Sequence, residues 1–271
     1  MTAATDPVIN GVDHIVIAVR ELDAGIRTYE TLLGRPGAER AERDGVANAV
    51  LAAGNVAVEL MAPVGESDAA RRLRSAIDDG GEGLKSIVFS TTDIERAHRH
   101  AARVGLVPEE IAARDTWRSF RLNTDRTYGV RLFILHRDAA PAVASLSSGV
   151  VGLDHLVVRS AGMERAAALY GARLGLSMRL DREVMGRRLM FFRAGEIVVE
   201  IAENKAAALD RLWGLSWRVA DAEAEQARLA WAGLDVSEVR GGMKPGTRVF
   251  TVRDGTAGVP TLMIEARPRR D

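Results

Sequence analysis

The sequence contains no cysteine, only three lysines and no long uninterrupted run of hydrophobic residues. The lack of cysteine excludes disulfides, thiolate metal sites, iron–sulfur clusters and cysteine nucleophiles. No stretch approaches the roughly 18 apolar residues that cross a bilayer, and residues 1–13 lack the basic start and apolar core of a signal peptide. We therefore expect a cytoplasmic protein with no membrane partner.

The sequence also has no excess of positive or negative charge. The 37 Lys and Arg residues balance 37 Asp and Glu residues, so the formal net charge is zero. A general attraction to nucleic acid is therefore not expected. The 271 residues, 47% of them hydrophobic, supply enough apolar material for one large domain or two domains of about 100–150 residues each.

An internal repeat organises the chain. GVDHIVIAV begins at Gly11 and GLDHLVVRS begins at Gly152, an offset of 141 residues. The same offset relates Tyr29 to Tyr170 and Gly34 to Gly175, and both glycines stand where a helix is expected to end. It also preserves the separation of a histidine from a glutamate, because 59 − 14 and 200 − 155 both equal 45. Such a repeat indicates a duplicated structural unit.

Each half reads as two copies of a smaller module. An apolar strand is followed by a helical pattern, near residues 21–33 and 163–174, and then by short strands. A weaker copy follows within each half, and the offset between these copies is 129 or 130. We predict an α+β fold of four βαβββ modules. The predicted domains are residues 1–137 and 150–271, joined by an Ala/Ser-rich linker at 138–149.

This organisation resembles the vicinal oxygen chelate superfamily, which includes glyoxalases, methylmalonyl-CoA epimerase, extradiol dioxygenases and antibiotic-binding resistance proteins. The resemblance covers nearly the whole chain. The segments DHIVIAV, ETLLG and VELMAPVGESD make the first half most similar to an epimerase or glyoxalase. It implies that paired modules form two half-open barrels of mixed sheet with helices outside. It also implies up to four metal ligands in each half, projecting into the barrel.

The resemblance assigns the first two ligand positions in each half to a histidine and a glutamate. These are His14 and Glu59 in the first half, and His155 and Glu200 in the second. Such mixed donors suit Zn, Mn, Fe, Co or Ni. The third position is usually a histidine. It falls on Ser86 in the first half and on Gly214 or Ser216 in the second, which is a departure from the family pattern.

The fourth position lies on the last strand of each half and is usually a glutamate. Glu265 is the candidate in the second half. The first half offers Phe133 or His136, depending on the alignment, and an odd shift reverses the face on which a side chain lies. The sequence leaves these two alternatives open. The most complete ligand set is therefore His155, Glu200 and Glu265, with Glu200 and Glu265 as candidate proton-transferring bases.

Other residues are candidates for binding the substrate. Arg118 and Arg248 could hold a carboxylate or phosphate, and Phe120 and Phe250 stand beside them. Ser86 and Ser216 are further substrate-binding candidates. Pairing of these arginines with a strand neighbour is at least as well supported. His98 and His100 are two apart on a helical segment and are expected on the surface. The Gly-rich segment at 240–248 is a candidate lid.

Three functions are consistent with these observations. The leading one is a metal-assisted isomerase, epimerase or lyase that acts through an enolate-type intermediate on a small oxo or acyl compound. A second is a metal-free protein that binds a small molecule, favoured by the missing third ligand. An extradiol ring-cleaving dioxygenase is the third, and the missing histidine argues against it. A monomer and a homodimer are both consistent with the internal symmetry.

Overall fold

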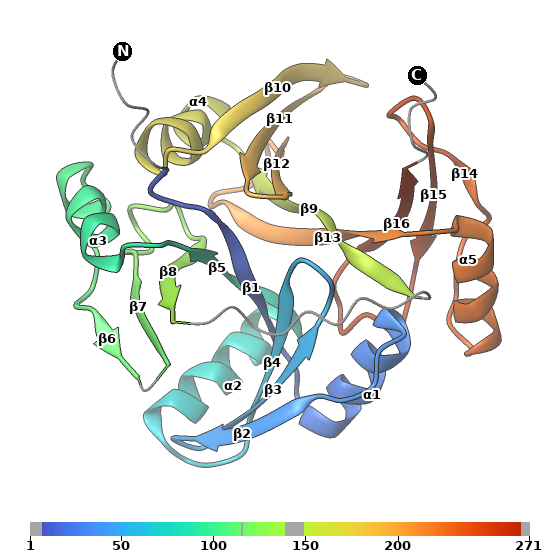
Figure 1. Ribbon diagram of the computed structural model, residues 1–271, viewed down its shortest axis with the longest axis horizontal. Helices are drawn as coiled ribbons and strands as arrows, with labels where there is room; N and C mark the ends of the chain where they lie inside the picture. Colours follow the sequence, from blue (N-terminus) through green and yellow to red (C-terminus); the bar gives the residue numbers. More distant parts are fainter. Residues whose placement is uncertain (1–6, 115, 139–148, 267–271) are drawn as a thin grey trace. The chain divides into compact units, whose positions relative to one another are not determined.

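Two eight-stranded sheets contain all the strands of the computed structural model, which describes residues 7–114, 116–138 and 149–266 (Figure 1). The first sheet comprises β1 (Gly11–Ala18), β2 (Glu39–Arg43), β3 (Val46–Ala52), β4 (Ala57–Pro63), β5 (Gly83–Ser90), β6 (Ala112–Ala113), β7 (Trp117–Arg121) and β8 (Arg131–Arg137). The second comprises β9 (Val150–Ser160), β10 (Ser177–Val184), β11 (Arg187–Ala194), β12 (Ile197–Glu203), β13 (Arg211–Val219), β14 (Arg240–Gly241), β15 (Thr247–Val252) and β16 (Thr261–Ala266).

The two sheets have the same topology. The strand order is β2-β3-β4-β1-β5-β8-β7-β6 in the first sheet and β10-β11-β12-β9-β13-β16-β15-β14 in the second. Adding eight to each strand number of the first order gives the second. The predicted α+β fold with repeated modules is confirmed. The predicted domain boundaries stay a prediction, and most of the predicted linker, residues 139–148, lies outside the described residues.

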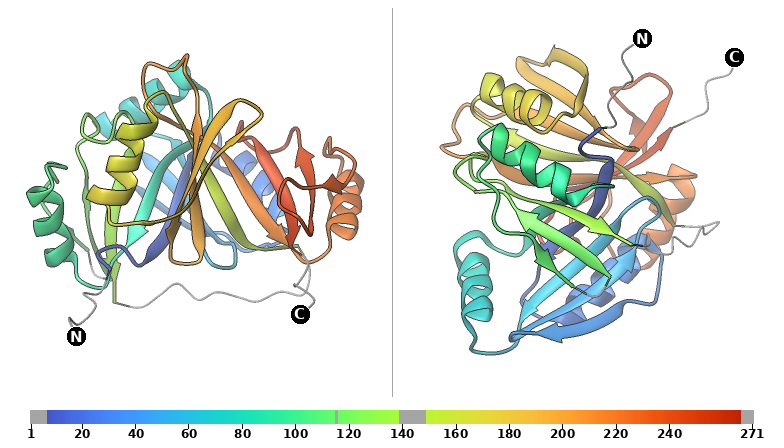
Figure 2. Two further views of the ribbon diagram at one scale, coloured as in Figure 1. Left: turned by 90° about the horizontal axis from the view of Figure 1, so that it is seen from above. Right: turned by 60° about the vertical axis from the view of Figure 1, so that its left-hand side comes forward.

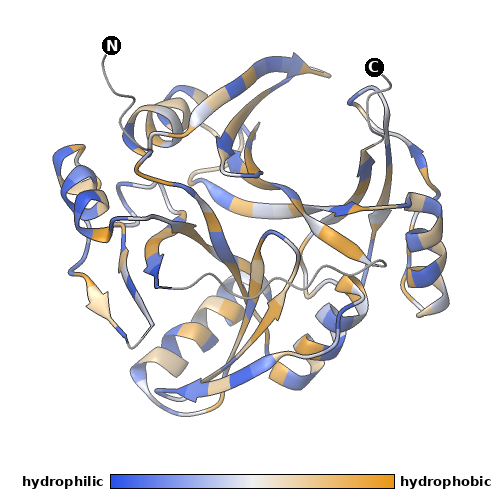
Figure 3. Cartoon of the chain, viewed as in Figure 1, coloured by the Kyte–Doolittle hydropathy of each residue, from blue (hydrophilic) through white to orange (hydrophobic). Residues whose placement is uncertain are grey.

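The hairpins at one edge of each sheet show how closely the halves correspond. Asp44 and Gly45 connect β2 to β3 with φ angles of 49° and 68°. Met185 and Gly186, which are 141 positions later, connect β10 to β11 with φ angles of 50° and 73°. Two consecutive positive φ angles are typical of the tight turn that matches the twist of a hairpin. In Figure 3, β2 is coloured mostly as hydrophilic, in keeping with its five exposed residues.

The helices are α1 (Leu22–Leu33), α2 (Asp68–Gly80), α3 (Ile94–Arg103), α4 (Met163–Ala166), the π-helix η1 (Ala167–Arg173) and α5 (Ala222–Trp231). Helix α1 ends as predicted at Gly34, whose φ of 67° and backbone N–H bond to Glu30 complete the cap. No described helix is long and apolar enough to span a membrane.

Two features of the helices differ from the expectation. Helix α2 was not predicted; its N-terminus is capped by the Ser67 hydroxyl, which accepts from the N–H of Ala70. The predicted helix near 163–174 is α-helical only over its first turn and continues as the π-helix η1. At the end of η1 the N–H of Leu174, the residue after the helix, donates to the carbonyl of Leu169, five residues earlier.

The chain forms two compact units, each assembled from distant parts of the sequence. The described parts of Met1–His14, Ser86–Ala140 and Val157–Leu212 form the first unit. Those of Ile15–Lys85, Pro141–Leu156 and Trp213–Asp271 form the second. The second module therefore packs with the third, and the first module packs with the fourth.

A half-buried arginine connects the two modules of the second unit. Arg228 of α5 donates to the carbonyl oxygens of Thr31 and Leu32 at the end of α1, at 2.8 and 3.1 Å. Its charge is balanced by Glu225, which is 5% exposed and lies 2.6 Å away. The guanidinium thus supplies donors to carbonyls that a helix end leaves without partners.

The first unit has an equivalent contact between an arginine and the end of a helix. Arg173, at the end of η1, donates to the carbonyls of Val104 and Gly105 just after α3, at 3.0 and 2.6 Å. The His100 ring nitrogen Nε2 lies 2.9 Å from the Arg173 carbonyl. Helix α3 accordingly lies beside the α4–η1 segment in both views of Figure 2. In each unit one arginine connects modules that are far apart in sequence.

Replacing Arg228 tests this connection. We expect Arg228→Met to lower the free energy of unfolding by about 3 kcal/mol, because it leaves Glu225 as a buried charge without this ion pair. Urea unfolding measures the effect. The control is Arg27→Met, an exposed position on α1, which should change stability by less than about 0.5 kcal/mol. Equal effects of the two substitutions on the free energy of unfolding would contradict a stabilising role of the contacts between Arg228 and α1.

Candidate functional site

The strands that pack on a helix have one covered face, and we call the opposite face of the sheet the open face. On β4, Val58 and Leu60 are fully buried, whereas Glu59 is partly exposed. Neighbouring strand residues alternate between the faces, so Glu59 lies on the open face, opposite Val50 of β3. The Asn48 amide donates to its carboxylate at 2.8 Å. Glu59 therefore has the orientation that the resemblance implied.

His14 of β1 is held by an acidic neighbour. Its Nδ1 lies 2.6 Å from a carboxylate oxygen of Asp13, and Arg137 donates to both oxygens of the same carboxylate. Burial raises the pKa of Asp13, but the hydrogen bonds from His14 and Arg137 outweigh it and leave the pKa below its usual value. The carboxylate is therefore ionised at neutral pH and accepts the Nδ1 proton of the ring, which leaves Nε2 as the other functional atom.

The strand register decides between Phe133 and His136. Val88 of β5 pairs with Phe133 of β8, and Ser86 lies two residues before Val88, so Ser86 and Phe133 share a face. His136 is three residues beyond Phe133 and lies on the opposite face, paired with Arg118. There its Nδ1 lies 3.1 Å from the carbonyl of Thr91. The open-face position is occupied by Phe133.

His155 repeats the arrangement of His14. Its Nδ1 lies 2.9 Å from a carboxylate oxygen of Asp154. The pKa of Asp154 is lowered: burial raises it, but the hydrogen bond with His155 and the nearby charges of His155, Arg218 and Lys244 outweigh burial. Both halves thus keep a paired aspartate and histidine.

Glu200 repeats the arrangement of Glu59. It lies between the fully buried Val199 and Ile201 and is itself partly exposed. It pairs with Phe191 of β11, so both lie on the open face. The glutamate positions of both halves thus face away from the helices.

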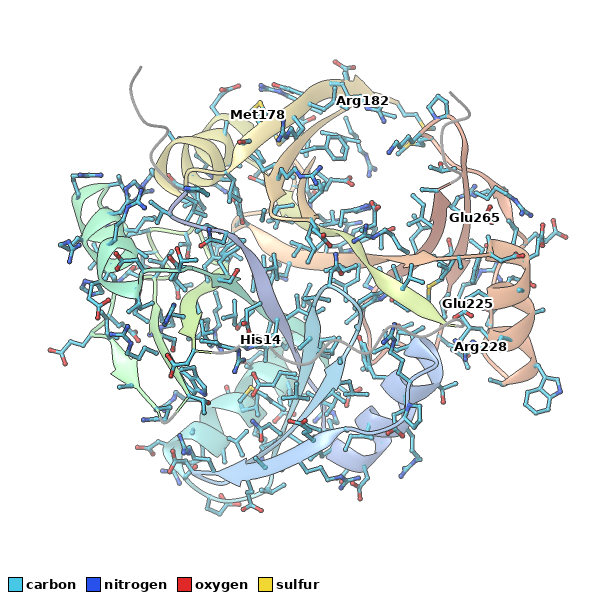
Figure 4. The ribbon with its side chains drawn as sticks, viewed as in Figure 1. His14, Met178, Arg182, Glu225, Arg228 and Glu265 are labelled. Atoms are coloured by element: carbon cyan, nitrogen blue, oxygen red, sulfur yellow. The ribbon has the colours of Figure 1, made fainter. Side chains whose placement is uncertain are left out.

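Glu265 lies on the helix-covered face of β16. Ser216 of β13 pairs with Leu262, and Glu265 is three residues beyond Leu262, so it shares a face with the fully buried Trp217 and Met263 instead. Its carboxylate accepts the N–H of Ala222, the first residue of α5, at 2.9 Å. Arg248 lies 3.4 Å from the same oxygen. Figure 4 labels Glu265. The open-face position on β16 is instead occupied by Leu262.

The remaining substrate-binding candidates also contact helices. Arg118 pairs with Glu95 in the first turn of α3, and Phe120 makes an edge-on contact with the ring of His98. Arg248 pairs with Glu223 in the first turn of α5. Phe250 is fully buried on the same face, paired with Met263. Ser216 is different, because it lies on the open face and its buried hydroxyl has no hydrogen-bond partner among the described residues.

The open-face donors do not fit the superfamily's metal. The four positions read His14, Glu59, Ser86 and Phe133 in the first half, and His155, Glu200, Ser216 and Leu262 in the second. A catalytic zinc site takes three protein ligands, and neither serine, phenylalanine nor leucine supplies a ligand for a transition metal. Over the described ranges the structure contains no group of three or more His, Asp or Glu side chains that could hold a metal ion.

Sequence reasoning did not identify the arginines on the open face of the second half. Arg159, Arg182 and Arg187 lie on β9, β10 and β11. The signal was present in the repeat, because the residues 141 positions earlier are Ala18, Ala41 and Val46. Comparing the two halves position by position would have singled out these three arginines.

The repeated βαβββ modules, the two mixed sheets and the His–Glu spacing define a glyoxalase-like protein. Family models agree: a glyoxalase-like domain matches residues 12–179, and the glyoxalase/bleomycin resistance protein/dioxygenase superfamily matches residues 152–259. The chain therefore belongs to the glyoxalase-like family of the vicinal oxygen chelate superfamily. No protein of curated function matches the sequence significantly.

Solved structures show the same fold at low sequence identity. A variant of 4-hydroxymandelate synthase from Streptomyces coelicolor matches with a TM-score of 0.72 and 14% identity, over 96% of this chain and 94% of that one. The Mn(II)-bound glyoxalase from Novosphingobium aromaticivorans gives 0.67 and 15%, over 95% and 82%. BphC, a halotolerant catechol dioxygenase, gives 0.65 and 14%, over 96% and 87%.

Substitution of Glu265 distinguishes a structural role from a metal-binding one. We expect Glu265→Ala to lower the free energy of unfolding by about 1–2 kcal/mol, because α5 loses the acceptor for its first N–H. Glu265→Gln keeps an acceptor and should recover most of that loss. Chemical denaturation measures both, with the exposed Glu238→Ala as control. Unchanged stability in Glu265→Ala, combined with loss of a bound metal, would contradict the structural role.

Proposed function

We propose that this protein binds a small organic molecule on the open face of its C-terminal sheet, without the transition metal that the superfamily commonly uses. One observation carries the proposal. The third and fourth ligand positions share the open face in each half, and they are occupied by Ser86 with Phe133 and by Ser216 with Leu262. An apolar and a hydroxyl side chain at these positions suit contact with an organic ligand better than coordination.

The open face has the composition of a ligand site. Leu180, Phe191 and Glu200 lie in one row across β10, β11 and β12, as their register shows. Phe191 is partly exposed, and Leu180 is 43% exposed. Apolar surface with a few placed polar groups is typical of sites that bind small molecules. Phe191 and Leu180 would contact the apolar part of the ligand, and Glu200 would contact a polar group.

Metal-assisted isomerase, epimerase or lyase chemistry on an oxo or acyl compound is the second candidate. The pairing of Asp154 with His155, and of Asp13 with His14, favours it, because a metal-bound histidine commonly donates its other ring N–H to a carboxylate. A bound divalent metal would stabilise an enolate oxygen. The resemblance assigns His155, Glu200 and Glu265 as ligands, but Glu265 lies on the helix-covered face. The remaining two are fewer than a catalytic site usually has.

Metal analysis separates the two candidates. We expect protein purified without chelator to contain well below one equivalent of Zn, Mn, Fe, Co or Ni by mass spectrometry. Adding Mn²⁺, Fe²⁺, Ni²⁺ or Zn²⁺ should leave the melting temperature unchanged, because two ligands do not form a tight site. The His155→Ala variant should behave in the same way.

The opposite result has a specific meaning. About one equivalent of metal, lost in His155→Ala, would overturn metal-free binding and support the metal-assisted enzyme. Oxygen consumption with catechol by such a metal-loaded protein would indicate ring cleavage instead. A matched control is Glu196→Ala, an exposed acid in the turn before β12, which should leave metal content and melting temperature unchanged.

A further inference from the structure

A cavity of about 270 Å³ lies within the second unit. Its walls come from the first half of α1, from the loop that connects β15 to β16, and from Glu82 just before β5. Among the described residues, none of the open-face positions considered above lines this cavity. It is therefore a separate space, and its lining has to be explained by itself.

The equivalent place in the first unit is filled by side chains. The repeat relates Ala24 of α1 to Arg165 of α4, 141 positions later, and each is the third residue of its helix. Arg165 lies 2.7 Å from the buried carboxylate of Asp210. Its guanidinium carbon lies 4.9 Å from the centre of the Tyr128 ring. One arginine thus contacts an acid and an aromatic ring at the same time.

The loop that carries Tyr128 has the same backbone in both units. Tyr128 and Ala257 are 129 positions apart and have φ angles of 56° and 48°, and a glycine with positive φ follows each of them. In both loops the N–H two residues after this position donates to the carbonyl just before it. The side chain at this position, however, is a phenol ring in the first unit and a methyl group in the second.

Glu82 occupies the position of Asp210. Each of these acids lies against the glycine of its loop: a Cβ at Gly129 would be 3.1 Å from the carbonyl oxygen of Asp210, and a Cβ at Gly258 would be 3.2 Å from that of Glu82. The second unit therefore keeps the acid but lacks the guanidinium and the ring that fill the space beside it. The cavity is the space that these two smaller side chains leave.

The charged side chains around the cavity favour a positively charged ligand. The Glu82 carboxylate accepts the backbone N–H of Arg20 at 2.6 Å, and it forms no ion pair with any residue that the structure describes. The guanidinium of Arg20 pairs with another acid. Arg253, the basic residue of the lining, lies 2.7 Å from Asp235 outside it. Asp254 adds a second acid to the lining, so the cavity presents more negative than positive charge.

We infer that this cavity binds a small organic cation with a guanidinium group, which takes the place that the Arg165 side chain fills in the first unit. The Glu82 carboxylate would accept hydrogen bonds from the planar guanidinium. The space beside Ala257 would hold an apolar or aromatic group attached to it. A volume of about 270 Å³ suits a compact ligand. This site goes beyond the binding proposed for the open face and does not depend on it.

Titration of the full chain with ethylguanidinium, followed by ¹⁵N NMR, tests the inference. Ethylguanidinium contains the atoms by which the side chain of Arg165 exceeds that of Ala24. We expect saturable shifts of the backbone amides of residues 255–258, with a dissociation constant in the millimolar range because the ligand is so small. Glu82→Gln should weaken binding by about fivefold or more, since a charge-assisted hydrogen bond is lost. Ethylurea, a neutral molecule of the same shape, should not bind.

A second variant fills the cavity from within the chain. Ala24→Arg supplies the side chain that the first unit carries, so it should abolish the binding of ethylguanidinium and should keep or raise the melting temperature. The control is Glu238→Gln, an exposed acid of the same unit outside the cavity, which should leave the affinity within about twofold.

Three results would overturn the site. These are equal shifts with ethylurea, an unchanged affinity in Glu82→Gln, and the absence of saturable binding at every ethylguanidinium concentration that leaves the protein folded. The proposed function at the open face is unaffected by any of them, because its metal analysis concerns other residues.

Discussion

The two-residue period of a β-strand determines which side chains of this protein can meet a ligand. Where a strand packs one face on a helix, every second residue belongs to that contact. Phe133 and His136 are three residues apart and consequently have different surroundings, an open face and the α3-covered face. The same rule places Leu262 on the open face and Glu265 beneath α5. Whether a side chain can contact a ligand thus depends on whether its position along the strand is odd or even relative to the open face.

The same constraint explains the positions of the charged residues that hold helices in place. Arg118 and Arg248 lie on helix-covered faces and pair with Glu95 and Glu223, acids in the first turns of α3 and α5. Glu265 accepts an N–H at the start of α5. Arg173 and Arg228 donate to carbonyls at the C-terminal ends of α3 and α1. Negative groups at helix starts and positive groups at helix ends complement the helix dipole.

Much of the fold could be predicted from the sequence because a repeat constrains it twice. The offsets of 141 and 129 or 130 predicted the repeated order of strands and helices in both halves, and the glycine at 34 predicted the end of α1. Helix α2 was missed although its signal was present: the offset falls from 141 to 129, so the first half holds 12 residues that the second lacks. The face of His136 could not be predicted, because register depends on pairing with β7 and β5.

Duplication also accounts for the separation of architecture from recognition in this chain. Both halves retain the Asp–His pair, the glutamate 45 residues later and the hairpin turn, so these features belong to the shared framework. Arg159, Arg182 and Arg187 occur in the second half alone, because the equivalent positions of the first half are Ala18, Ala41 and Val46. A difference that is confined to one copy is not a requirement of the shared fold. It belongs to the features that distinguish the C-terminal sheet from its duplicate.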